Sequence, residues 1–84
     1  MVATGRVQGV GYRMWAWREA DRLGIVGTIR NRSDGAVEIL ARGTAAALDR
    51  FHQLLLRGPV GAEVEEVSRQ PAHDIRVDSF EIVG

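Results

Sequence analysis

The segment Gly5 to Arg13, with the sequence GRVQGVGYR, combines residue types and a spacing that predict anion binding. Gly9 and Gly11 permit backbone angles at which successive N–H groups converge on one point. A helix expected to begin near Tyr12 adds its unpaired N–H groups and the positive end of its dipole. Arg13 adds a planar, permanently charged guanidinium that matches phosphate or carboxylate oxygens. We therefore predict a phosphate-binding loop that consists of Gln8, Gly9, Val10, Gly11, Tyr12 and Arg13.

A short glycine pattern also occurs in tight turns that serve only packing, so the elements around this loop must decide its role. Apolar residues recur with a helical period from Tyr12 through Ala16 to Leu23, before a possible stop at Gly24. Thr44 is a good N-cap for a second helix, and Asp34 with Gly35 marks a hairpin turn. The pattern predicts helices at residues 12–23 and 44–57 and strands at residues 2–7, 25–31, 36–42, 62–70 and 80–83.

This order predicts a single α+β domain, residues 1–84, with the ferredoxin-like split βαββαβ fold. In that fold two helices cover one face of an antiparallel sheet. The first two strands run parallel with the third between them, so Asn31 lies at the same end of the sheet as the glycine loop. Asn31 shares a face of its strand with Ile29. An anion in the loop would then lie within one water molecule of Asn31.

The same segments, in the same order, closely resemble the acylphosphatase family. The resemblance rests on GRVQGVGYR, on LGIVGTIRN at residues 23–31, on DGAVEI at residues 34–39, on GP at residues 58–59 and on FEI at residues 80–82. It spans nearly the whole chain, which a chance glycine motif would not do.

The resemblance implies an enzyme that hydrolyses the carboxyl–phosphate bond of acyl phosphates without a metal or other cofactor. The products are a carboxylate and inorganic phosphate. The family's arginine falls on Arg13, which grips the phosphoryl oxygens, and its asparagine falls on Asn31, which orients the attacking water. The acyl group is expected to project into solvent and to meet few residues that specify it.

Two residues depart from the family pattern, and the first strand is short. Tyr12 stands where the family usually has phenylalanine, so its hydroxyl needs a partner. Thr28 replaces a common tryptophan, on the face of its strand opposite to Ile29. The first strand begins close to Met1, and a short strand would hold the loop less firmly.

The composition excludes several other kinds of chemistry. The chain has no cysteine, which excludes disulfides, thiolate zinc sites and a cysteine nucleophile. All 11 basic residues are arginines, so there is no P-loop lysine, and 11 acids balance them. No basic surface is expected to hold nucleic acid, and no apolar run is long enough to span a membrane. We expect a cytoplasmic monomer.

Other residues that could carry function have plain structural explanations. Met14 and Trp17 lie off the apolar stripe of the first helix. They could mark a surface for a partner, but scattered exposed apolar residues are normal, and we favour that second interpretation. His52 and His73 lack neighbouring ligands and are expected at the surface. Further candidates are Arg30 and Arg32, which could guide an anionic substrate, and the acidic residues Glu63, Glu65 and Glu66, which fit a solvated strand edge.

Three alternative functions remain open from the sequence. The first is a non-catalytic domain that binds phosphate or carbamoyl phosphate, as at the front of hydrogenase-maturation proteins. The second is an RNA-recognition domain of the same fold, which would need aromatic residues on its central strands. The strands at residues 2–7 and 37–41 have none, and the balanced charge also argues against this alternative. The third is a regulatory domain that binds phosphate-like anions without releasing phosphate from an acyl phosphate.

Overall fold

The computed structural model of the chain describes residues 1–72 and 75–84. His73, one of the two histidines noted above, lies outside the described residues. The elements in chain order are β1 (Val2–Arg6), α1 (Tyr12–Arg22), β2 (Val26–Asn31), β3 (Val37–Arg42), α2 (Ala45–Arg57), β4 (Glu63–Ser68) and β5 (Phe80–Ile82). Each predicted element is present, and its bounds differ from those expected by at most two residues, as fraying ends usually do.

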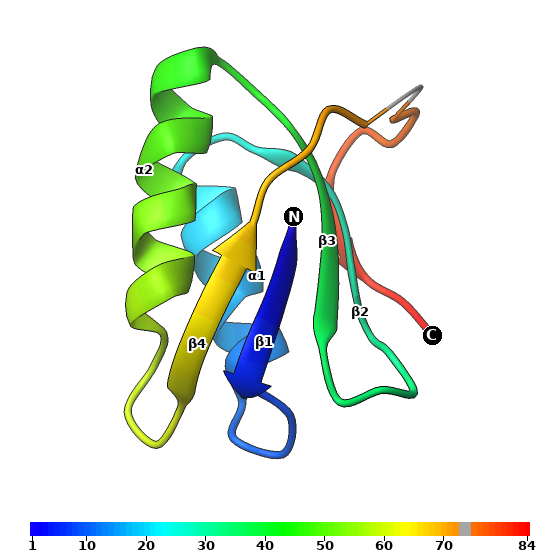
Figure 1. The fold of residues 1–84 in the computed structure, drawn as a ribbon. Coiled ribbons are helices and arrows are strands. Elements are labelled where there is room, and N and C mark those ends of the chain that lie inside the picture. Colours follow the sequence, from blue (N-terminus) through cyan, green and yellow to red (C-terminus); the bar gives the residue numbers. More distant parts are fainter. Residues whose placement is uncertain (73–74) are drawn as a thin grey trace.

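The strands form one sheet in the order β4-β1-β3-β2-β5, and the two helices pack on one of its faces (Figure 1). The neighbours β4, β1, β3 and β2 pair antiparallel, so β1 and β2 run in the same direction on either side of β3. This arrangement confirms the ferredoxin-like α+β prediction. The short β5 is an addition to that plan, because it pairs parallel to β2 and makes the sheet mixed.

Local sequence signals explain where the elements begin and end. Tyr12, Ala16 and Ala20 form the buried face of α1. The Thr44 hydroxyl accepts a hydrogen bond of 3.1 Å from the Ala47 N–H, which caps the start of α2. The buried face of α1 packs with Phe51, Leu55 and the inward residues of the strands into one core. The two helices therefore cover one face of the sheet, and this is the face on which Asn31 was predicted to lie.

Two glycines allow neighbouring strands to approach closely. Gly5 has φ +108° at a bulge in the β1–β4 pairing, and a Cβ atom there would lie 2.3 Å from the Glu63 carbonyl oxygen. Gly27 has φ +153°, and a Cβ atom would lie 1.8 Å from the Leu40 carbonyl oxygen. Any side chain at either position would push the sheet apart.

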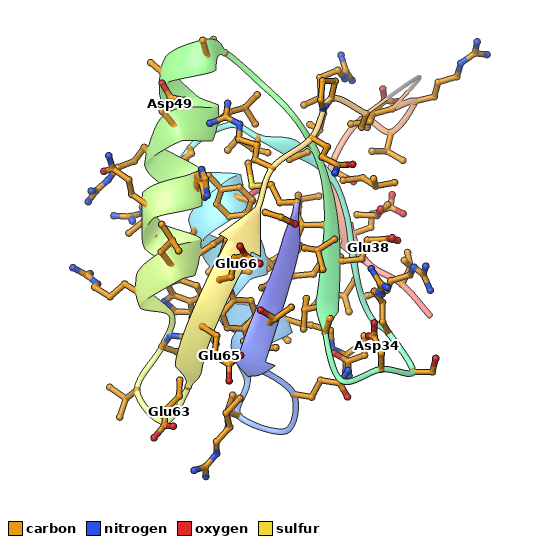
Figure 2. The ribbon with its side chains drawn as sticks, in the orientation of Figure 1. Asp34, Glu38, Asp49, Glu63, Glu65 and Glu66 are labelled. Atoms are coloured by element: carbon orange, nitrogen blue, oxygen red, sulfur yellow. The ribbon has the colours of Figure 1, made fainter. Side chains whose placement is uncertain are left out.

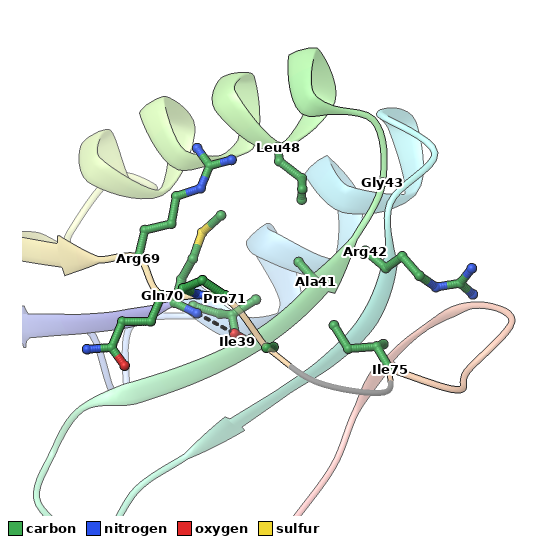
Figure 3. Close-up of a pocket in the computed structure, with 11 residues that line it drawn as sticks. Ile39, Ala41, Arg42, Gly43, Leu48, Arg69, Gln70, Pro71 and Ile75 are labelled. Atoms are coloured by element: carbon green, nitrogen blue, oxygen red, sulfur yellow. Dashed lines mark hydrogen bonds between the residues drawn. The ribbon is translucent and has the colours of Figure 1, made fainter.

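A cavity of about 800 Å³ opens at the start of β1, at the end of that strand opposite to the glycine loop (Figure 3). The β1–β3 pairing covers only two residues of β1, although the Met1 ammonium also donates to the Ile39 carbonyl at 2.6 Å. Burial lowers the pKa of that ammonium. Over the residues that the structure describes, neither helix is long and apolar enough to cross a membrane.

Candidate active site

The loop between β1 and α1 has the backbone conformation that the glycine pattern predicts. Gly9 and Gly11 both have φ +76°, in the left-handed region that other residues rarely adopt. A Cβ atom at either glycine would meet no atom of the described residues within 4 Å. Glycine is therefore required here by the positive φ angle, and not by a lack of space for a side chain. The backbone of the loop faces open space.

The start of α1 presents unpaired N–H groups at this loop. Gly11 is the N-cap residue and no side chain caps the helix. The first turn contains no acidic residue to neutralise the positive end of the helix dipole. An anion placed at the start of α1 would find both N–H donors and a favourable field.

A cavity of about 320 Å³ adjoins the loop and brings together side chains from both ends of the sequence. Four of the six predicted loop residues line it, whereas Gln8 and Val10 do not. Its lining residues are Val7, Gly9, Gly11, Tyr12, Arg13, Met14, Asn31 and Ile82. The two predicted catalytic residues, Arg13 and Asn31, therefore share one cavity.

Arg13 is half-buried, and no hydrogen-bond or ion-pair partner for it occurs among residues 1–72 and 75–84. The neighbouring arginines differ from it in this respect. Arg30 pairs with Glu38 at 2.7 Å, and Arg32 pairs with Asp34 at 2.9 Å. These pairs neutralise the two side chains that we considered as guides for a substrate. Arg13 keeps its donors available for an anion in the cavity.

Asn31 has a buried side-chain oxygen, Oδ1, without a hydrogen-bond partner in the described part of the chain. An unsatisfied buried acceptor costs about 1–3 kcal/mol, so folded proteins seldom keep one unless a bound molecule supplies the donor. Asn31 ends β2 on the same face as the fully buried Ile29. Its side chain can therefore accept a hydrogen bond from a water molecule held in the cavity.

Gln8 has a role that the sequence did not reveal. Its amide nitrogen, Nε2, donates to the Arg32 carbonyl at 2.8 Å and to the Ala36 carbonyl at 2.9 Å. Those carbonyls flank the turn between β2 and β3. The side chain of Gln8 thus ties the glycine loop to the end of the strand that carries Asn31, across 24 and 28 residues of sequence. Nothing in the local pattern around Gln8 indicates these partners.

Tyr12 contributes its backbone to the site, while its side chain points into the core. Its hydroxyl donates to the Leu55 carbonyl at 2.7 Å, near the end of α2 where helix carbonyls lack helical partners. Burial raises the pKa of this hydroxyl. The hydroxyl that distinguishes Tyr12 from phenylalanine is therefore a structural hydrogen-bond donor.

The other candidates lie away from the cavity. His52 is half-buried and its Nε2 lies 2.9 Å from the Val67 carbonyl, so it links α2 to β4 and is not the plain surface residue expected. Glu63, Glu65 and Glu66 lie along the exposed edge strand β4 and do not line the cavity (Figure 2). The described residues contain no group of three side chains that could hold a metal ion.

Comparison with known proteins decides the family. A model of the acylphosphatase family matches residues 1–82 of this chain. The chain belongs to the acylphosphatase family. It is 43% identical over 75 residues to an acylphosphatase of Pasteurella multocida, covering 89% of this chain and 83% of the relative. It is 49% identical over 71 residues to one of Nitrobacter hamburgensis, covering 84% and 72%.

Solved acylphosphatases have the same fold. The crystal structure of the Bacillus subtilis acylphosphatase superposes with a TM-score of 0.93 at 37% identity, covering 99% of this chain and 93% of that one. The chain also superposes on part of full-length HypF, with a TM-score of 0.82 at 25% identity. That match covers 99% of this chain and 11% of HypF. The many acylphosphatases among these relatives favour a catalytic acylphosphatase, which is a hydrolase, over a non-catalytic domain.

Proposed function

We propose that this chain hydrolyses the carboxyl–phosphate bond of small acyl phosphates to a carboxylate and inorganic phosphate, without a metal or other cofactor. In reaction classes it is a hydrolase of phosphorus-containing acid anhydrides. One observation carries the proposal. The buried oxygen of Asn31 and the guanidinium of Arg13, neither of which has a partner among the described residues, line the same cavity.

Arg13 and the backbone N–H groups of the loop bind the phosphoryl group. Phosphoryl transfer passes through a loose transition state in which charge is spread over the three equatorial oxygens. The guanidinium offers two parallel hydrogen bonds, and the start of α1 adds donors fixed before the reaction begins. These donors stabilise the phosphoryl charge that a metal ion stabilises in many other enzymes.

Asn31 orients the attacking water. Its Oδ1 accepts a hydrogen bond from the water, so the water's lone pair can face phosphorus on the side opposite to the leaving carboxylate. The carboxylate is already a good leaving group and needs little acid catalysis. The water adds to phosphorus, the P–O bond to the carboxylate breaks, and the released proton leaves with the phosphate product or the solvent.

We also propose that residues 1–84 form a single domain that works as a cytoplasmic monomer. The monomer is supported by the fact that one chain supplies both Arg13 and Asn31. The natural acyl phosphate could come from any reaction that activates a carboxylate with phosphate.

The decisive experiment measures phosphate release from benzoyl phosphate in the presence of a chelator. We expect Asn31→Ala to lose roughly a hundredfold or more in kcat while inorganic phosphate still inhibits as in the wild type. Arg13→Ala should lose turnover and phosphate inhibition together. Leu56→Ala, at an exposed position of α2, is the matched control. An Asn31→Ala protein with normal turnover would refute the assigned role.

A regulatory or non-catalytic domain gives a different result in the same assay. It would bind inorganic phosphate through Arg13 but release none from benzoyl phosphate at any protein concentration. Wild-type turnover that requires an added metal ion would contradict the metal-independent mechanism.

A further inference from the structure

Two exposed apolar side chains line the anion cavity, and a third lies about one helical turn away along α1. Met14 is 49% exposed, Ile82 is 38% exposed and Trp17 is 36% exposed. Met14 and Ile82 line the same cavity as Arg13 and Asn31. The cavity lining therefore combines a cationic and an amide side chain with an apolar side formed by Met14 and Ile82.

The fold fixes this apolar side through two elements. Met14 and Trp17 lie three residues apart on α1, so they are neighbours on the helix surface. The Trp17 indole Nε1 donates to the Phe80 carbonyl at 2.7 Å, which ties this surface of α1 to β5. Ile82 pairs with Ile29 in the parallel register, two residues before Asn31. The parallel addition of β5 is thus what brings Ile82 to the cavity.

The charge and size of the cavity indicate what the apolar side contacts. Arg13 is the one charged residue among those lining it in the described part of the chain, and the phosphoryl group engages that charge. A cavity of about 320 Å³ has room beyond a phosphoryl group. A ligand with an anionic end and an apolar body would satisfy both sides.

We propose that Met14 and Ile82 form the acyl-binding side of the site, with Trp17 behind them, and that they select acyl phosphates with an apolar aromatic or branched acyl group. This inference rests on the proposed hydrolysis of acyl phosphates. It replaces the expectation that the acyl group projects into solvent. An acetyl group is too small to cover both side chains, and an acyl group with a second carboxylate would lose hydration against them.

The test compares kcat/KM for benzoyl, acetyl and succinyl phosphate in the wild type, Met14→Ala and Ile82→Ala. The ratio of kcat/KM for benzoyl to acetyl phosphate should fall roughly three- to tenfold in each variant, mainly through KM for benzoyl phosphate. Comparing this ratio between proteins cancels the different intrinsic reactivities of the two substrates. Met14→Leu should retain most of the wild-type ratio, and the control Leu56→Ala should retain all of it.

The outcomes separate this inference from the proposed function. If the variants hydrolyse acyl phosphates with the wild-type ratio, or if wild type prefers succinyl phosphate, the acyl-binding role is wrong while the proposed function stands. If wild type hydrolyses none of the three substrates, the proposed function itself fails. Inhibition by inorganic phosphate in each variant verifies that the loop is folded and that Arg13 still binds phosphate. A lower benzoyl-to-acetyl ratio then cannot be attributed to a damaged phosphate site.

Discussion

In the proposed mechanism, Arg13 acts through the geometry of its guanidinium as well as its charge, and this distinction can be measured. Lysine would keep the positive charge but replace a planar pair of donors with a single flexible ammonium. We expect Arg13→Lys to lose at least about tenfold in kcat/KM for benzoyl phosphate, which corresponds to about 1.4 kcal/mol. Steady-state phosphate release checks this. Activity near that of the wild type would mean that charge alone is sufficient.

Tyr12 is expected to affect stability and not turnover. Its hydroxyl donates to the Leu55 carbonyl, so Tyr12→Phe leaves a buried acceptor unpaired and should lower the free energy of unfolding by about 1–3 kcal/mol. Because folding raises the pKa of the hydroxyl, its stabilisation is complete below the unfolded value of 10.0 and is lost as the pH rises above it.

Urea unfolding from pH 7 to pH 11 tests both statements about Tyr12. The wild type should lose stability above pH 10, and the Tyr12→Phe protein should lose less over the same range. Equal alkaline losses in the two proteins would show that Tyr12 is not the responsible group. A large loss of kcat in Tyr12→Phe would contradict a purely structural role.

At the scale of elements, the side chain of Gln8 connects the glycine loop to the β2–β3 turn. Gln8→Ala removes two hydrogen bonds and should destabilise the protein by about 1–3 kcal/mol. Because the loop would then move relative to Asn31, we expect kcat to fall and phosphate inhibition to weaken. Gln53→Ala, at an exposed position of α2, is the control. Unchanged kinetics in a destabilised Gln8→Ala protein would limit Gln8 to folding.

The start of β1 offers a second test at this scale. The register of β1 on β3 places a residue two positions ahead of Met1 opposite Ala41, inside the cavity of about 800 Å³. An engineered Arg-Val-Thr extension, whose central valine takes this position, should pair there and raise the free energy of unfolding by about 1–2 kcal/mol, since that valine buries apolar surface. A Ser-Gly-Ser extension is the control. Equal thermal midpoints for the two extended proteins would contradict strand pairing.

The sequence predicted the elements and the fold because apolar periodicity and turn residues are local signals. Tyr12, Ala16 and Ala20 specify a helix face wherever that helix packs. The pairing of β5 with β2 and the hydrogen bonds of the Gln8 side chain depend on which segments meet in three dimensions. No local sequence pattern encodes those contacts. The sharing of one cavity by Arg13 and Asn31 was predictable, because strand parity and the order of β1, β3 and β2 determine it.

At the scale of the whole molecule, the proposed mechanism uses no side chain that titrates near neutral pH. The described residues that line the cavity include no carboxylate and no imidazole. Arginine stays charged and asparagine does not ionise. We therefore expect kcat for benzoyl phosphate to change by less than about twofold between pH 6 and pH 8.5, in contrast to the bell-shaped profile of acid–base catalysis. A steep change within that range would reveal a general base.

The pairing of β1 with β4 has a consequence for the order of folding. The register joins Val2 to Ser68, so most of the chain must be in place before β1 can dock in the middle of the sheet. Contacts between residues this far apart in sequence form late, because the intervening chain loses much conformational freedom. The glycine loop continues directly from β1. In a refolding experiment, α-helical signal should therefore return before enzymatic activity, which makes catalysis a reporter of the last step of folding.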